Sequence, residues 1–151
     1  NRTPVKSLDE LIRSGRFHPS VQTRLEAAQR ATAPVDSQPG CAGNEAYRAD
    51  FRAVFGAALD RLQLDAVVYP TWSNPPRLIG DLNTPAGDNS QVFSPTTGWP
   101  AITVPMGYTR NNTLPAGMTI LGRAWSEAEL FKLAYSYEQA THHRRAPASA
   151  P

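Results

Sequence analysis

The fold is decided by the stretch TGWPAITVPMG, which occupies residues 97–107. Its centre, residues 101–104, is a short apolar run rich in β-branched side chains, which is typical of a strand buried on both faces. Pro100 and Pro105 lie at the two ends of this run, where the missing N–H of proline does not interrupt a sheet. A second strand bounded by Gly and Pro is expected over residues 114–122. The connection between the two is too short for a helical crossover, so we expect antiparallel neighbours.

The remaining segments predict an α/β fold. Residues 1–32 carry helical segments, and residues 33–43 are rich in Pro and Gly, which is typical of a loop or linker. The longest amphipathic pattern begins at residue 44, and an apolar strand follows over residues 64–69. Residues 44–145 therefore predict helix, strand, long loop, strand, strand and helix in that order. Residues 146–151 are expected to be a frayed tail.

Two helices carry more detailed expectations. Aromatic and aliphatic residues recur at helical spacing over residues 47–62, and this stripe is expected to pack in the core. The last helix is expected to begin with a capping box formed by Ser126 and Glu129. Trp125 and Leu130 have the spacing of a hydrophobic staple at the same helix start.

Composition is ordinary for a globular protein and excludes several classes of function. The 151 residues are 40% hydrophobic and 19% charged, with a formal net charge of +2. The basic residues are scattered, so no nucleic-acid partner is expected. No window approaches the roughly 18–20 apolar residues of a membrane span. The single cysteine, Cys41, permits no internal disulfide and leaves the compartment undecided. We expect a soluble protein, with the cytoplasm as the favoured location.

The long irregular region over residues 71–93 is the best candidate for a binding site. Loops of more than about 12–15 residues without regular structure are uncommon unless they are functional or mobile. This one begins at the carboxyl end of a predicted buried strand, which is where open α/β sheets place ligands. Two interpretations of Trp72 stand at this point: it lines a pocket, or it pins the loop to the core.

The residue types that carry most enzymatic chemistry form no catalytic or metal-binding motif in this sequence. His18 stands alone, and the adjacent His142 and His143 cannot face one ion from the same side of a helix, so no metal site is expected. No glycine-rich phosphate loop is present, and no serine lies in a nucleophile-elbow pattern. Lys6 and Lys132, the only lysines, lie on predicted helices where a solvated role is expected.

Four ordered blocks nevertheless resemble the C-terminal part of enzymes of the amidase signature family. They are LDAVVYPT at 64–71, SPTTGWPAITVPMG at 94–107, LPAGMTILGR at 114–123 and YEQAT at 137–141. The resemblance implies the C-terminal part of the amidase signature fold, a mixed β-sheet with helices packed on both faces. It also implies hydrolysis of an amide or transfer of the released ammonia, without a metal or organic cofactor.

The resemblance implies further that the catalytic groups lie elsewhere. The family uses a Ser nucleophile, a second Ser on a strained peptide bond and a Lys base, which belong to the N-terminal half of its domain. The Gly/Ser-rich run that carries the nucleophile does not occur in this sequence, and Lys6 and Lys132 match no catalytic position. We therefore expect no catalytic residue in this chain, no activity of the chain alone, and an N-terminal amidase half as its partner.

The same resemblance places candidate substrate-binding residues in the long loop. Tyr69, Thr71 and Trp72 are expected at the strand end that faces the substrate channel. An acidic residue that holds the substrate amide in amidotransferase relatives corresponds to Asp88 or Asn89. The alternative for these two is simple turn formation.

Two functions remain open from the sequence. The first is the C-terminal half of an amidase that acts on a small-molecule carboxylic amide. The second is a non-catalytic remnant or binding module. A half-domain should expose the apolar flanks of residues 101–104 and 118–121, whereas a stand-alone domain should cover them.

Overall fold

The computed structural model describes residues 4–34, 37, 39–85 and 87–147. The chain divides into two compact units, Asn1–Asn44 and Glu45–Pro151, and each is described here by itself. The first unit contains α1 (Leu8–Ser14), the short 3-10 helix η1 (Pro19–Val21) and α2 (Gln22–Arg30). The Ser7 side chain caps α1 by accepting a hydrogen bond from the Glu10 N–H at 3.1 Å. Gly15 ends α1 with a left-handed φ of 61°.

Helix α3 (Pro39–Leu62) is longer than the sequence pattern predicts. The expectation of a linker over residues 33–43 was wrong for its last five residues, because the helix already begins at Pro39. Proline is well suited to a first helical position, where its fixed φ matches the helix and its missing N–H is not needed. Gly40 and Gly43 lower the helix propensity of this turn but do not end the helix.

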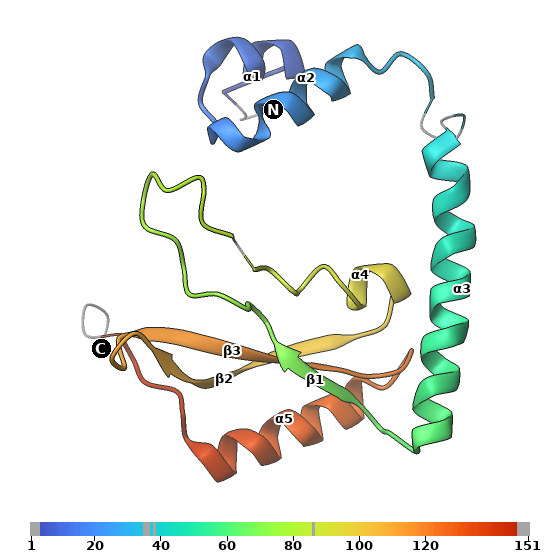
Figure 1. The fold of residues 1–151 in the computed structure, drawn as a ribbon, viewed down its shortest axis with the longest axis vertical. Coiled ribbons are helices and arrows are strands. Elements are labelled where there is room, and N and C mark those ends of the chain that lie inside the picture. Colours follow the sequence, from blue (N-terminus) through green and yellow to red (C-terminus); the bar gives the residue numbers. More distant parts are fainter. Residues whose placement is uncertain (1–3, 35–36, 38, 86, 148–151) are drawn as a thin grey trace. The chain divides into compact units, whose positions relative to one another are not determined.

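The second unit is built on a three-stranded sheet with the order β1-β3-β2 (Figure 1). Its strands are β1 (Val67–Pro70), β2 (Ala101–Thr109) and β3 (Leu114–Leu121), and β3 pairs antiparallel with both neighbours. The predicted antiparallel pairing of β2 and β3 is confirmed.

Strand β2 does not stop at Pro105, as the sequence predicts, but continues to Thr109. The register shifts between Pro105 and Gly107, so that Met106 is an extra residue in a β-bulge. Among the described strands β2 lies at an edge of the sheet, where a proline without an N–H is tolerated. Gly107, with φ 127°, accommodates the local distortion.

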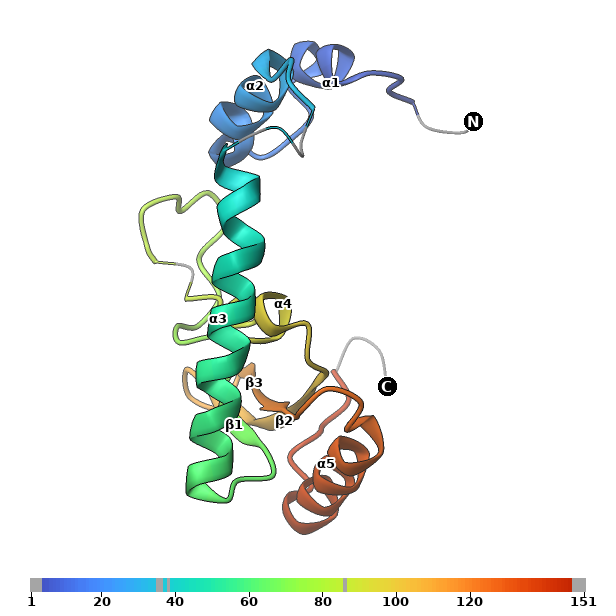
Figure 2. The same ribbon diagram turned by 90° about the vertical axis from the view of Figure 1, so that its right-hand side faces the viewer.

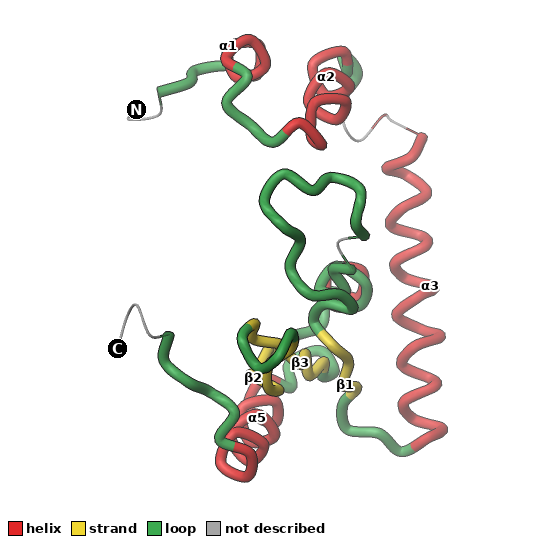
Figure 3. Tube along the Cα trace, turned by 60° about the vertical axis from the view of Figure 1, so that its left-hand side comes forward, coloured by secondary structure: helices red, strands yellow, loops and turns green. Residues whose placement is uncertain are grey.

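Helix α5 (Glu127–Thr141) covers one face of the sheet, and Figures 1 and 3 show the short α4 (Ser94–Thr97) on the opposite side. The core under α5 consists of Val104, Ile120, Leu130 and Ala134, each at most 4% exposed. Burial alternates along β2, whose Thr103 is exposed. The expectation that residues 101–104 are buried on both faces was therefore wrong, because α5 packs against only one of them.

On the other side of the sheet, aromatic rings join α3 to the loop before α4 (Figure 2). The ring centroids of Phe55 and Phe93 lie 5.2 Å apart in a stacked arrangement, and Phe93 lies 5.2 Å from Tyr69 of β1. Trp99 extends the cluster, 5.7 Å from Phe55. The predicted core stripe is thus present in α3, where Leu59 is also buried.

Apolar residues that the described chain leaves exposed lie on α3, β1 and α5. Val54 is 72% exposed, Val68 58% and Phe131 65%. They do not lie on the strand flanks expected of a half-domain, because Val104 and Ile120 are buried under α5.

The start of α5 also differs from expectation. Ser126 occupies the N-cap position but makes no capping hydrogen bond, and its hydroxyl instead donates to the Arg123 carbonyl at 2.8 Å. Trp125 has a φ of 64° and is 91% exposed, so it forms no staple with the buried Leu130. Of the tail expected to be frayed, residues 148–151 lie outside the described residues. Within the described chain, no helix combines the length and apolarity needed to cross a bilayer.

Candidate substrate pocket

The loop after β1 is irregular over residues 71–93 apart from one isolated bridge, as the sequence predicts (Figure 3). Backbone hydrogen bonds close its base: the Ser73 N–H donates to the Gly87 carbonyl at 2.7 Å, and the Asn89 N–H donates to the Thr71 carbonyl at 2.9 Å. Trp72 and Asp88 form the isolated bridge between these bonds. The loop is therefore a compact surface loop with adjoining ends.

Asn89 reinforces this closure with its side chain. Its Nδ2 donates to the Pro70 carbonyl at 2.9 Å and to the Ser73 Oγ at 2.7 Å. The facing residue must be glycine, because a Cβ on Gly87 would lie 2.7 Å from the Asn74 Nδ2 and its φ is 72°. Asn89 thus fastens the loop to the end of β1.

Asp88 organises the turn that follows. Its Oδ1 accepts hydrogen bonds from the Ser90 N–H at 2.9 Å and the Ser90 Oγ at 2.6 Å, and its Oδ2 accepts from the Gln91 Nε2 at 2.9 Å. These bonds, those from Ser90 above all, hold the pKa of the Asp88 carboxyl below its ordinary value. The contacts are those of a turn-forming aspartate.

Thr71 joins the loop to the sheet through a row of threonines. Its Oγ1 shares a hydrogen bond with the Thr119 Oγ1 at 2.8 Å, and Thr119 shares another with the Thr103 Oγ1 at 3.2 Å. The Thr71 N–H donates to the Gly117 carbonyl at 2.8 Å. A Cβ at Gly117 would lie 2.9 Å from the Thr103 Cγ2, so the absence of a side chain there makes room for the row.

Tyr69 points into the aromatic cluster rather than toward the loop, with its ring against Phe93. Its hydroxyl oxygen is buried and has no hydrogen-bond partner among the described residues. Burial raises the pKa of the Tyr69 hydroxyl above its ordinary value.

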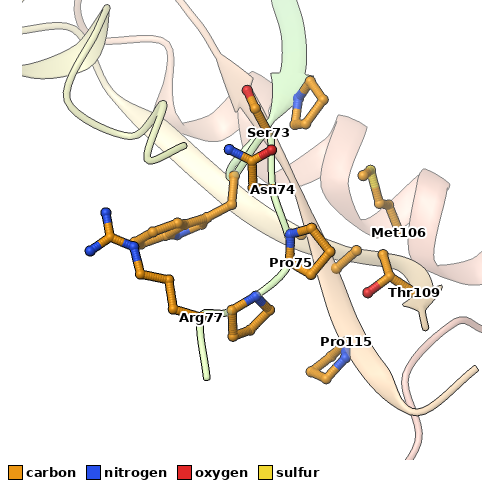
Figure 4. A pocket seen from close by; sticks show the side chains of 12 residues that line it. Ser73, Asn74, Pro75, Arg77, Met106, Thr109 and Pro115 are labelled. Atoms are coloured by element: carbon orange, nitrogen blue, oxygen red, sulfur yellow. The ribbon is translucent and has the colours of Figure 1, made fainter. Parts of the chain in front are cut away.

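A hollow of about 600 Å³ lies between the start of the loop and the β2–β3 hairpin (Figure 4). Its walls are mostly apolar, with several prolines beside Trp72, Met106 and Ala116. Figure 4 shows Ser73, Asn74, Pro75 and Arg77 from the loop, with Met106, Thr109 and Pro115 from the hairpin. The volume lies within the roughly 300–1,000 Å³ typical of small-molecule sites.

The structure separates the five predicted substrate residues into two groups. Trp72, which is 50% exposed, lines the hollow. Thr71, Asp88 and Asn89 build the closed base of the loop, and Tyr69 lies in the aromatic cluster.

Sequence reasoning missed Arg77 and Met106, both of which line the hollow. Met106 reaches it from the β-bulge, which the adjacent Pro105 and Gly107 could have indicated. The described residues contain no group of acidic, His or Cys side chains arranged to hold a metal ion.

Comparison with known proteins identifies the family. The sequence profile of the Amidase family matches residues 3–131. The chain is 32% identical over 105 residues to the amidase-type component of glutamyl-tRNA(Gln) amidotransferase from Bacillus cereus, covering 66% of the chain and 20% of that protein. It is 34% identical over 104 residues to the same component from Halalkalibacterium halodurans, covering 65% of the chain and 20% of that protein.

Solved structures agree with the sequence comparison. Peptide amidase from Stenotrophomonas maltophilia matches with a TM-score of 0.66 and 32% identity over 97% of the chain and 30% of that protein. An amidase family protein from Bacillus anthracis matches with a TM-score of 0.67 and 25% identity over 97% of the chain and 26% of that protein. The chain belongs to the amidase family, and the predicted amidase-type α/β fold is confirmed. It spans about a fifth of the curated relatives and about 30% of the solved peptide amidase.

Proposed function

We propose that this chain is the C-terminal part of an enzyme that hydrolyses a carboxylic amide to an acid and ammonia or an amine. In this proposal the chain supplies scaffold and one wall of the substrate pocket. The observation that carries it is the hollow of about 600 Å³ beside Trp72, at the end of a strand, in a chain of the amidase family. Amidase and peptide amidase are the activities named for the relatives of matching fold.

The five predicted residues take different roles in this proposal. Trp72 contacts the apolar part of the substrate directly. Thr71 and Asn89 hold Trp72 in place through their bonds to β3 and to the start of the loop. Asp88 fixes the following turn, and its remaining acceptor capacity faces the substrate amide. Tyr69 supplies a hydroxyl that has no partner within the described chain.

The proposal places the Ser-Ser-Lys machinery outside these 151 residues, in an N-terminal amidase part of the same polypeptide or of a separate chain. Lys132 is unsuited to act as the base, because its side chain is 73% exposed and its Nζ lies 3.0 Å from the Glu129 carboxylate. No metal or organic cofactor enters the proposed reaction. The chain alone is therefore expected to be inactive.

Ammonia release from a panel of primary amides tests this function, using the native protein that carries the chain. Trp72→Ala is expected to lower kcat/KM by about tenfold, the order found when apolar contacts to a substrate are lost. Trp125→Ala is the matched control, because Trp125 is 91% exposed and does not line this hollow. Absence of ammonia release for every amide, or equal effects of the two variants, would contradict the proposal.

A second candidate is a non-catalytic binding module, and one observation favours it. Val104 and Ile120 are covered by α5 within this chain, as expected of a domain that hides its own strand flanks. A module of this kind would bind ligands in the hollow without turnover, so the ammonia assay separates the two functions.

A further inference from the structure

We propose that the hollow beside Trp72 selects amides that carry both an apolar group and a carboxylate, with Arg77 binding the carboxylate. This inference rests on the proposed function and specifies its substrate class. The apolar walls would hold the hydrocarbon part of the ligand, and the guanidinium at the loop side would hold its charge.

The walls suit a flat or branched hydrocarbon group. Trp72 presents an aromatic ring that is half exposed, and Met106 and Ala116 close the opposite side. The bulge in β2 places Met106 in the hollow, because the extra residue changes the facing of the side chains after Pro105. Methionine is flexible and polarizable, so it adapts to aromatic and aliphatic groups alike.

Arg77 is the only charged residue among the described residues that line the hollow. Within the described part of the chain, no carboxylate lies within 4 Å of its guanidinium. A guanidinium presents several N–H donors in a planar fork that matches a carboxylate. The hollow therefore combines an apolar volume with a single cation suited to an anionic group.

Asp81 is the acidic side chain whose charge interacts with Arg77, but its oxygens are already engaged. The Asp81 Oδ1 accepts from the Asn83 N–H at 2.9 Å and the Thr84 N–H at 3.1 Å, and its Oδ2 accepts from the Thr84 hydroxyl. These bonds hold the pKa of Asp81 below its ordinary value, and the charge of Arg77 contributes the smallest part. Asp81 thus remains ionised for the turn and leaves the fork of Arg77 available to a ligand.

Isothermal titration calorimetry with two probes tests the inference on the native protein that carries the chain. The probes are 3-phenylpropionate and 3-phenylpropan-1-ol, which share the phenyl group and chain length but differ in charge. Neither contains an amide, so binding is measured without catalysis. We expect the carboxylate to bind at least about tenfold more tightly than the alcohol, as a charge-assisted hydrogen bond to Arg77 implies.

Arg77→Gln is expected to remove this preference, leaving the two probes within about twofold while the alcohol binds as before. Arg61→Gln is the matched control, because Arg61 is exposed in the last turn of α3 and does not line the hollow. Ala116→Phe should weaken both probes by filling the apolar volume, and thermal unfolding of each variant shows that the fold persists.

Equal affinity for the two probes, a preference that survives in Arg77→Gln, or no binding of either probe would overturn the inference. Its failure is distinct from failure of the proposed function. Ammonia release without a carboxylate preference would refute only the role of Arg77, whereas probe binding without ammonia release from any amide would refute the hydrolase.

Discussion

The Tyr69 hydroxyl is a buried polar group without a hydrogen-bond partner in the described chain. A buried donor that lacks a partner lowers the free energy of unfolding, because the hydroxyl gives up its bonds to water. In the proposed enzyme a substrate or another part of the protein would supply that partner. This residue therefore distinguishes a structural tyrosine from one that is completed by binding.

Tyr69→Phe is expected to raise the free energy of unfolding by about 1 kcal/mol in urea denaturation, since it removes the unpaired hydroxyl and keeps the ring against Phe93. Tyr108→Phe is the control with the opposite sign, because the Tyr108 hydroxyl accepts from the Arg145 N–H at 3.2 Å. A Tyr69→Phe variant that is less stable than the parent would show that the hydroxyl already has a partner.

Gly117→Ala is expected to destabilise the protein by about 1–3 kcal/mol. Its Cβ would lie 2.9 Å from the Thr103 Cγ2 and 3.1 Å from the Thr71 Oγ1, in the row of threonines that holds the loop. Gly40→Ala should instead stabilise by roughly 0.5–1 kcal/mol, because it lies within α3 and a Cβ there meets nothing within 4 Å. Thermal unfolding of both variants measures the contrast, and a neutral Gly117→Ala would show that the row is not closely packed.

At the scale of elements, the unit from Glu45 onward is organised by what covers each face of its sheet. Helix α5 buries the Val104 and Ile120 side of β2 and β3, and the aromatic cluster of α3 lies against the other side of β1. The loop over residues 71–93 is then held at its two ends, which positions the hollow.

Leu130→Ala in α5 is expected to cost about 2–5 kcal/mol of stability, because Leu130 is 3% exposed and packs in the core. Phe131→Ala, at the next residue of the same helix, should change stability by no more than about 0.5 kcal/mol, because Phe131 is 65% exposed. Similar losses for the two variants would indicate that a further partner covers Phe131.

Acid is expected to loosen the loop before it unfolds the sheet. The pKa of Asp88 and of Asp81 is lower in the folded protein, so each stabilises the loop at neutral pH and loses this effect as the pH falls below about 4. Amide hydrogen exchange across residues 81–91 should therefore accelerate in acid before that of β3. Asp88→Asn should reduce this pH dependence, and an exchange profile that is unchanged by acid would contradict the assignment.

Local patterns predicted the elements better than their ends. The pairing of β2 and β3 follows from two apolar runs with a short connection, which leaves only an antiparallel hairpin. Pro39 and Pro105 misled, because proline is compatible with a first helical turn and with a bulged edge strand, and only tertiary context decides. Trp72 could be placed in the loop, but the hollow could not be outlined because Arg77 and Met106 come from separate segments.

At the scale of the whole molecule, the chain is a portion of an amidase-type fold that carries its own covered sheet. It spans about a fifth of the curated relatives, and exposed apolar residues such as Val54 and Val68 lie on α3 and β1. Such exposed side chains are suited to contact with a further part of the enzyme. The account therefore assigns pocket and scaffold to this chain and catalysis to residues beyond it.

Size-exclusion chromatography of the native protein, with mass spectrometry and ammonia release measured on every fraction, tests this assignment most directly. We predict that amide hydrolysis coincides with a species that contains this chain and is clearly larger than its 16.5 kDa. A protein that exists only as a 16.5 kDa species, whether it releases ammonia by itself or not at all, would contradict the account.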